Sequence, residues 1–231
     1  MRVIEAGKAH AQSRSFTPAS MAKYEETKAY RDQSIAWLVA TRGWYPAEVV
    51  DAWDMIQWPM NQLRTGRITA KGMEVASAYN VLTKLCTDKK TAYENFGDYA
   101  KHVLKTKFIF TTEEDNVIPP YAVQHLLAAI FKCPDCGREV GGKDWVCPKG
   151  HKGYDGMSGL YSVKSSPPVP MAFGDPRDPN DFKPRSVKRA IKASKVLEVN
   201  AIAMGCAIFR KGLFKNVPKP WFDTGDSYTQ D

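Results

Sequence analysis

The sequence predicts an α/β domain that carries a small metal-binding insert. Three observations support this class: short apolar segments alternate with amphipathic ones, three acidic residues directly follow one apolar segment, and three cysteines and a histidine gather between residues 133 and 151. Strands and helices that alternate along a chain build a sheet with helices on both faces. The length of 231 residues suits one large domain with an insert.

Residues 34–130 are predicted to contain two apolar strands and three helices. Residues 34–41 are apolar and end at an Arg-Gly turn, which is typical of a buried strand. Apolar side chains at helical spacing predict helices over residues 47–58 and 72–86. Residues 107–111 predict a second buried strand, and two prolines open a helix over residues 119–130.

The second half is less regular. Residues 157–164 are a strand candidate, and residues 165–184 form a loop rich in proline and aspartate. Residues 188–195 predict a helix, and residues 200–214 contain a strand-like run around Met204-Gly205-Cys206.

The excess positive charge lies in one segment. The chain has 33 basic and 25 acidic residues, a formal net charge of +8. Residues 183–219 hold ten basic residues and one acid, so the rest of the chain has 23 basic and 24 acidic residues and a net charge of −1. This favours a polyanionic partner, either a diphosphate or nucleic acid. A solvated basic face without a partner fits the same count.

Composition excludes several other classes of protein. No apolar run approaches the roughly 18 residues of a membrane span, so we expect no transmembrane segment. Residues 1–33 are charged and small, which predicts an N-terminal arm rather than a secretory signal. Five unevenly spaced cysteines do not form a disulfide framework, so we expect a cytoplasmic protein, in the host cytoplasm if the chain is viral. The sequence carries no signal for oligomeric state.

Three cysteines and a histidine have the spacing of a zinc site. Cys133 and Cys136 form one tight pair, and Cys147 and His151 form a second. Three thiolates and one imidazole suit a tetrahedral zinc ion and leave no open position for a substrate. We therefore expect a structural zinc ion in a zinc-ribbon-like insert at residues 132–155, rather than a catalytic one.

Three adjacent acids follow the strand at residues 107–111. Neighbouring carboxylates at the end of a buried strand repel one another unless a cation lies between them. Glu113, Glu114 and Asp115 therefore predict a site for a hard divalent ion, Mn²⁺ or Mg²⁺, which takes oxygen ligands and can bridge a diphosphate. A solvated acidic turn is the alternative interpretation.

The order of these motifs resembles that of nucleotide-sugar glycosyltransferases of the GT-A fold, particularly the family-two-like enzymes of phages and environmental genomes. The resemblance covers roughly residues 34–231, interrupted by the zinc insert. The matching segments are, in order, Thr41-Arg42-Gly43, Ala78-Tyr79-Asn80, Glu113-Glu114-Asp115-Asn116 with Pro119, Gly159-Leu160-Tyr161, Pro167 to Pro170, Met204 to Arg210, Pro220-Trp221-Phe222 and Thr229-Gln230-Asp231.

This resemblance implies a Rossmann-like GT-A domain over residues 34–231, with a mixed sheet flanked by helices. It implies inverting transfer of a sugar from a nucleoside-diphosphate sugar to an acceptor hydroxyl. Asp115, helped by Glu113 or Glu114, would hold Mn²⁺ or Mg²⁺ on the diphosphate, and Asp231 would be the catalytic base. Because the family normally continues past this last acid, we expect the chain to be incomplete at its C-terminus.

The resemblance also implies contacts to the donor. Thr41 and Arg42 would line the nucleotide pocket, Asn80 would contact the base or ribose, and Glu114 and Asp115 would complete the donor site. Trp221 would form a platform for a sugar ring, although packing in the core is the simpler interpretation.

A different class of function fits some of the same features. The zinc insert and the basic segment could form a nucleic-acid-binding module without catalysis. The insert itself has balanced charges and few aromatic side chains, which counts against this alternative. The glycosyltransferase and the nucleic-acid-binding interpretations combine in the hypothesis that the acceptor is a modified DNA base. Such a base would have to be extruded from the duplex to reach the donor.

Overall fold

The computed structural model describes residues 34–58, 64–162, 169–185 and 196–222. Three sequence-based predictions lie outside these residues: the arm at residues 1–33, the helix at residues 188–195 and the catalytic role of Asp231.

A five-stranded sheet forms the centre of the protein, with the strand order β2-β1-β3-β7-β4. Its strands are β1 (Ile35–Thr41), β2 (Arg64–Lys71), β3 (Phe108–Glu113), β4 (Gly156–Ser158) and β7 (Cys206–Arg210). β1 pairs in parallel with β2 and β3, whereas β7 is antiparallel to β3 and β4. The predicted α/β class with a mixed sheet is therefore confirmed.

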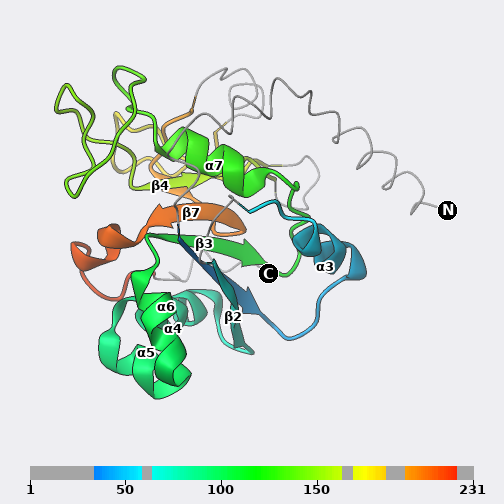
Figure 1. Ribbon diagram of the computed structural model, residues 1–231. Helices are drawn as coiled ribbons and strands as arrows, with labels where there is room; N and C mark the ends of the chain where they lie inside the picture. The colour runs from blue at the N-terminus through cyan, green and yellow to red at the C-terminus, as the bar shows by residue number, and fades with distance from the viewer. Residues whose placement is uncertain (1–33, 59–63, 163–168, 186–195, 223–231) are drawn as a thin grey trace.

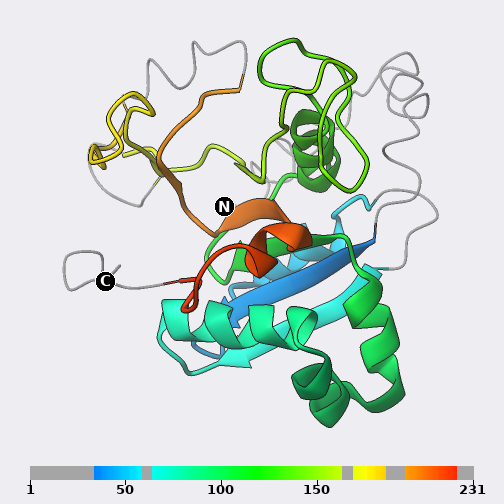
Figure 2. The same cartoon turned by 90° about the vertical axis from the view of Figure 1, so that its left-hand side faces the viewer.

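Helices cover both faces of the sheet (Figure 1). The helices are α3 (Ala47–Asp54), α4 (Val75–Thr87), α5 (Lys89–Phe96), α6 (Ala100–Lys105) and α7 (Ala122–Ile130), with short 3-10 helices η2 (Gly97–Tyr99) and η3 (Lys211–Lys215). α7 lies against β4 and β7 on one face, and α4 lies against β1 and β2 on the other. Figure 2 shows the loops of residues 132–155 beside α7, on the face opposite α4. A separate pair of short strands, β5 (Ala172–Phe173) and β6 (Ala201–Ile202), lies outside the main sheet.

Both faces of the two central strands are buried. Trp37 on β1 and Phe110 on β3 pack with α3 and α7, whereas Leu38 and Ile109, one residue along each strand, pack with α4. Successive strand residues point to opposite faces, so a strand covered on both sides needs an unbroken apolar run. This burial explains the continuous apolar segments in the sequence.

Several predicted bounds shift in the structure. The helix predicted over residues 72–86 begins at Val75, because Gly72 has a left-handed φ of 68° and turns the chain after β2. Glu74 caps this helix, and its carboxylate accepts hydrogen bonds from the backbone N–H groups of Ala76 (2.9 Å) and Ser77 (2.8 Å).

Other elements are shorter than predicted. The helix predicted over residues 47–58 ends at Asp54, and the one over residues 119–130 begins at Ala122. Within the described residues, the strand candidate at residues 157–164 contributes Gly156–Ser158 and an isolated bridge at Ser162.

The sequence pattern did not predict β2, α5 or α6. β2 is an edge strand that pairs with β1 alone, so it buries Thr65, Ile68 and Ala70 and exposes the residues between them. Residues 89–105 are mostly charged or polar, and their helices bury few side chains, Ala92 in α5 and Ala100 and Val103 in α6. These elements have no apolar face wide enough to be recognised from the sequence.

Among the described residues, no helix has both the length and the apolar character that a membrane crossing requires.

Candidate functional site

The four predicted metal ligands lie on two tight turns. The backbone N–H of Gly137 donates to the carbonyl oxygen of Cys133 (2.9 Å), and that of Gly150 donates to the carbonyl oxygen of Cys147 (2.8 Å). Both glycines have left-handed φ angles, 68° and 82°, which residues with a side chain rarely adopt. Each turn therefore brings together the two ligands of its own half of the motif, Cys133 with Cys136 and Cys147 with His151.

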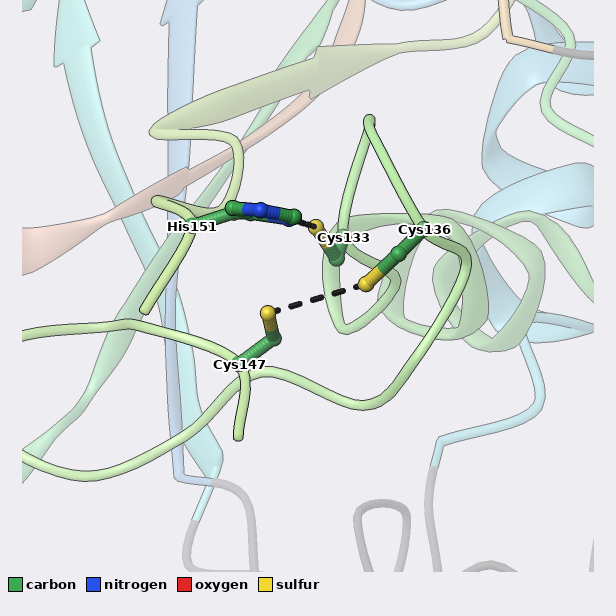
Figure 3. A group of neighbouring side chains, drawn as sticks. All are labelled: Cys133, Cys136, Cys147 and His151. Atoms are coloured by element: carbon green, nitrogen blue, oxygen red, sulfur yellow. Dashed lines mark hydrogen bonds between the residues drawn. The ribbon is translucent and has the colours of Figure 1, made fainter. Parts of the chain in front are cut away.

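The four side chains converge on one point (Figure 3). One ligand atom from each of Cys133, Cys136, Cys147 and His151 lies within 4.8 Å of the others. Cys133 Sγ is 3.7 Å from His151 Nδ1, and Cys136 Sγ is 3.6 Å from Cys147 Sγ. Two sulfur atoms bound tetrahedrally at about 2.3 Å lie about 3.8 Å apart, so the donors fit one tetrahedral ion.

The local environment of Cys147 favours the thiolate that a metal requires. Burial opposes ionisation of this thiol, but backbone N–H groups of Lys149 and His151 outweigh it and lower its pKa. The Lys149 N–H lies 3.3 Å from the sulfur. The turn therefore prepares the ligand for a cation.

The insert shares its core with the main domain. The ring of Trp145 packs 4.9 Å from Phe131 and 5.9 Å from Phe108, the first residue of β3. The guanidinium of Arg210, at the end of β7, lies 4.6 Å from the Trp145 ring and forms a 2.8 Å ion pair with Asp155. Trp145 adopts a left-handed φ of 55° in this position. The cluster thus fastens the insert to the sheet.

The acidic residues lie at the carboxyl end of β3, beside the end of β1. Glu113 pairs with Ala40 in the parallel register, so the turn at Thr41 and Arg42 lies next to the acids. Ligands of open α/β sheets bind at the carboxyl ends of the strands. The structure therefore brings together five predicted site residues: Thr41, Arg42, Glu113, Glu114 and Asp115.

Glu114 is bound to the β1 turn. Its Oε2 accepts hydrogen bonds from Thr41 Oγ1 (2.5 Å) and the Arg42 backbone N–H (2.7 Å), and its Oε1 accepts from Arg42 Nε (2.6 Å). Burial opposes ionisation of this carboxyl, but these hydrogen bonds outweigh it and lower its pKa. Glu114 is therefore a charged, anchored carboxylate.

Glu113 has the opposite electrostatic character. Burial, followed by the nearby charges of Asp115 and Glu114, raises the pKa of Glu113 to about 7. A carboxyl in this setting gains from a cation that removes the repulsion. Glu113 therefore differs from Glu114 although the two are adjacent in the chain.

Sequence reasoning missed two polar neighbours of Glu113. The hydroxyl of Tyr161 accepts a hydrogen bond from the backbone N–H of Gly205 (2.7 Å), and burial, followed by the charge of Glu113, raises the pKa of Tyr161. Buried Tyr79 donates its hydroxyl to the carbonyl oxygen of Thr112 (3.2 Å). Both tyrosines belong to segments that match the glycosyltransferase motifs, but nothing in the sequence indicates that they lie near Glu113.

Asn80 and Trp221 contact the C-terminal segment. Asn80 Nδ2 donates to the carbonyl oxygen of Phe222 (2.7 Å), and its Oδ1 accepts from the backbone N–H groups of Trp221 (2.8 Å) and Phe222 (3.2 Å). The partly buried Trp221 packs against Phe214 and donates its Nε1–H to that residue's carbonyl oxygen (3.0 Å). These contacts hold residues 221–222 on α4, and the predicted nucleotide contact of Asn80 stays a prediction.

Several residues of the basic segment make internal contacts. Arg185 forms an ion pair with Asp175 (3.3 Å), and Arg210 forms one with Asp155. Lys211 Nζ donates to the carbonyl oxygen of Leu104 (2.6 Å) at the end of α6. Three of the ten basic residues in this segment therefore have partners within the fold, so the charge count alone overstates the basic surface that these three offer to a polyanionic partner.

Comparisons of the chain with models of protein families, with curated proteins and with solved structures found no match.

Proposed function

We propose that this protein is a metal-dependent, inverting glycosyltransferase of the GT-A type that uses a nucleoside-diphosphate sugar as donor. One observation carries the proposal: the acids at the carboxyl end of β3 lie beside the Thr41-Arg42 turn of β1 in a mixed sheet. That edge is where open α/β sheets bind their ligands.

The oxygen donors at this edge suit Mn²⁺ or Mg²⁺. Asp115 and Glu113 would hold the ion, and Arg42 would contact the donor. When bound, the ion supplies a positive charge that stabilises the diphosphate leaving group. Asp231 would accept the proton of the acceptor hydroxyl as catalytic base, and it lies outside the described residues.

We further propose that the Cys₃His cluster binds a structural zinc ion. Thiolates and imidazole are the ligands that zinc prefers, and four protein ligands leave no position for a substrate. Chemistry is therefore assigned to the acidic edge, and the zinc site to stability.

The nucleic-acid-binding module is the weaker alternative, because Arg185, Arg210 and Lys211 are engaged inside the protein. A modified DNA base stays a hypothesis for the acceptor. DNA binding with a steep loss of affinity between 50 and 200 mM salt would favour the nucleic-acid-binding module.

A donor screen tests the proposed activity. The protein is incubated with Mn²⁺ and each common nucleotide sugar in turn, and released nucleoside diphosphate is measured. We expect release from one donor that requires the divalent ion. If every donor stays intact while DNA binds in a salt-dependent way, the binding module replaces the enzyme.

A further inference from the structure

We propose that Glu114 is a positioning residue: it holds Arg42 as the anion-binding group of the donor site, and the divalent ion binds without it. This inference deepens the proposed function and rests on it for the identity of the anion, the diphosphate of the donor. It gives the three adjacent acids two roles: Glu114 holds Arg42, and Glu113 and Asp115 bind the ion.

The hydrogen bonds of Glu114 leave little room for a metal. Its Oε2 already accepts two hydrogen bonds, from Thr41 Oγ1 and the Arg42 N–H, and its Oε1 lies 2.6 Å from Arg42 Nε. An ion bound to Oε1 would lie close to the positive guanidinium and be repelled by it. A divalent ion therefore gains more from Glu113 and Asp115.

Thr41 supports the same arrangement. Its hydroxyl has one proton, which it donates to Glu114, and its oxygen accepts a hydrogen bond from the backbone N–H of Gly43 (2.8 Å). Gly43 has a left-handed φ of 117°, and the side chain of Lys71 fills the space beside its α-carbon. The hydroxyl of Thr41 thus fixes the turn and has no proton left to donate to a nucleotide.

The side chain of Arg42 is exposed, whereas that of its partner Glu114 is buried. The side chain of Glu114 is 9% exposed, and that of Arg42 is 75% exposed. Arginine has five N–H donors, and within the described residues the contact with Glu114 engages the one on Nε. Because Nε is held by Glu114, the orientation of the planar guanidinium is restricted. The four N–H donors on its two Nη atoms form a fork that can bind two phosphate oxygens at once.

The experiment uses the purified, zinc-containing protein and two probes that need no turnover. Calorimetric titration measures the affinity for Mn²⁺ alone and for inorganic pyrophosphate with saturating Mn²⁺. The variants are Glu114→Gln, Arg42→Ala, Arg42→Lys and the double variant, with Asp115→Asn as the metal-site control. Thermal unfolding confirms that each variant is folded.

We expect Glu114→Gln to bind Mn²⁺ within about threefold of the parent and pyrophosphate about tenfold more weakly, because a charge-assisted hydrogen bond to the fork is lost. Arg42→Ala should show the same pattern, and Arg42→Lys should recover little, because lysine lacks the fork. The double variant should lose no more affinity than Arg42→Ala alone, since Glu114 acts through Arg42.

Three results would overturn the inference. These are a loss of Mn²⁺ affinity in Glu114→Gln as large as in Asp115→Asn, additive losses of pyrophosphate affinity in the double variant, and no pyrophosphate binding by the parent. If the titrations behave as expected but the donor screen shows no release of nucleoside diphosphate, the positioning role stands and the proposed transferase activity fails. If Glu114→Gln does not fold, the exposed Arg42→Ala variant still tests the anion-binding role, and a pyrophosphate affinity equal to that of the parent would overturn the inference.

Discussion

At the scale of single residues, Gly205 marks how closely polar groups pack at the acidic end of β3. A β-carbon at this position would collide with Asn116 Nδ2 and lie 2.7 Å from Tyr161 Oη and 2.9 Å from Glu113 Oε2. All three atoms end polar side chains that surround one backbone position. A side chain at residue 205 would therefore displace the polar ends of these three side chains.

We expect Gly205→Ala to destabilise the protein by about 1–3 kcal/mol, the usual cost of overpacking, and to weaken Mn²⁺ binding by moving Glu113. Thermal unfolding and a Mn²⁺ titration measure the two effects. Gly212→Ala is the matched control, because its β-carbon would meet only Arg210 Nη2 at 3.7 Å. Equal behaviour of the two variants would show that the site tolerates a methyl group at residue 205.

The raised pKa of Glu113 predicts a pH dependence of stability. This carboxyl titrates near 4.5 in the unfolded chain and at about 7 in the folded protein. Between these values the folded state holds a proton that the unfolded state has released, so stability falls as pH rises and the loss is complete above pH 7.

We expect Glu113→Gln to remove this loss. Without added Mn²⁺ or Mg²⁺, the parent should lose about 1–3 kcal/mol relative to the variant between pH 4.5 and pH 8. Urea unfolding at several pH values measures the difference. Parallel pH profiles for the two proteins would mean that the pKa of Glu113 is not raised.

At the scale of elements, the sequence predicted the strands buried on both faces and the helices with a wide apolar face, and it missed elements that bury few apolar side chains. β1 and β3 appear as apolar runs because helices cover both of their faces. β2 lies at the edge of the sheet and α5 exposes most of its surface, so neither carries a strong periodic signal. Local spacing was enough for the metal cluster, because its four ligands come from two short turns.

Zinc bound to the Cys₃His cluster should stabilise the insert and its contacts with the sheet. We expect Cys136→Ser to reduce bound zinc from one ion per chain and to lower the melting temperature, because metal binding contributes to folding. Metal analysis and thermal unfolding measure these changes.

The same variant should bind Mn²⁺ at the acidic edge nearly as well as the parent. Trp145 contacts Phe108, and Glu113 lies at the other end of β3, about 16 Å away at the usual rise per strand residue. A large loss of Mn²⁺ affinity in folded Cys136→Ser would show that the two metal sites are coupled. Parent protein that contains no zinc would contradict the assignment of the cluster.

At the scale of the whole molecule, the sheet brings together residues that lie far apart in the sequence. The strand ends at Thr41 and Glu113 are adjacent because β1 and β3 pair in parallel, and the order of motifs anticipated this edge. The ion pair of Arg42 with Glu114, the contact of Tyr161 with Gly205 and the bonds of Asn80 to the C-terminal segment depend on side-chain directions. No spacing in the sequence encodes them.

Some basic residues of the positively charged segment have partners within the folded protein. Residues 183–219 supply the whole net positive charge, yet Arg185, Arg210 and Lys211 bind partners inside the protein. Part of the positive charge counted in the sequence therefore contributes to contacts within the fold.

Binding of a nucleoside diphosphate to the parent and to Asp115→Asn, with and without Mn²⁺, tests the central claim most directly. We expect the parent to bind the nucleotide at least tenfold more tightly with Mn²⁺ than without it, and Asp115→Asn to lose this enhancement, because an amide is a poorer ligand for a hard cation. Equal, Mn²⁺-dependent binding by both proteins would contradict a metal-assisted donor site at the end of β3.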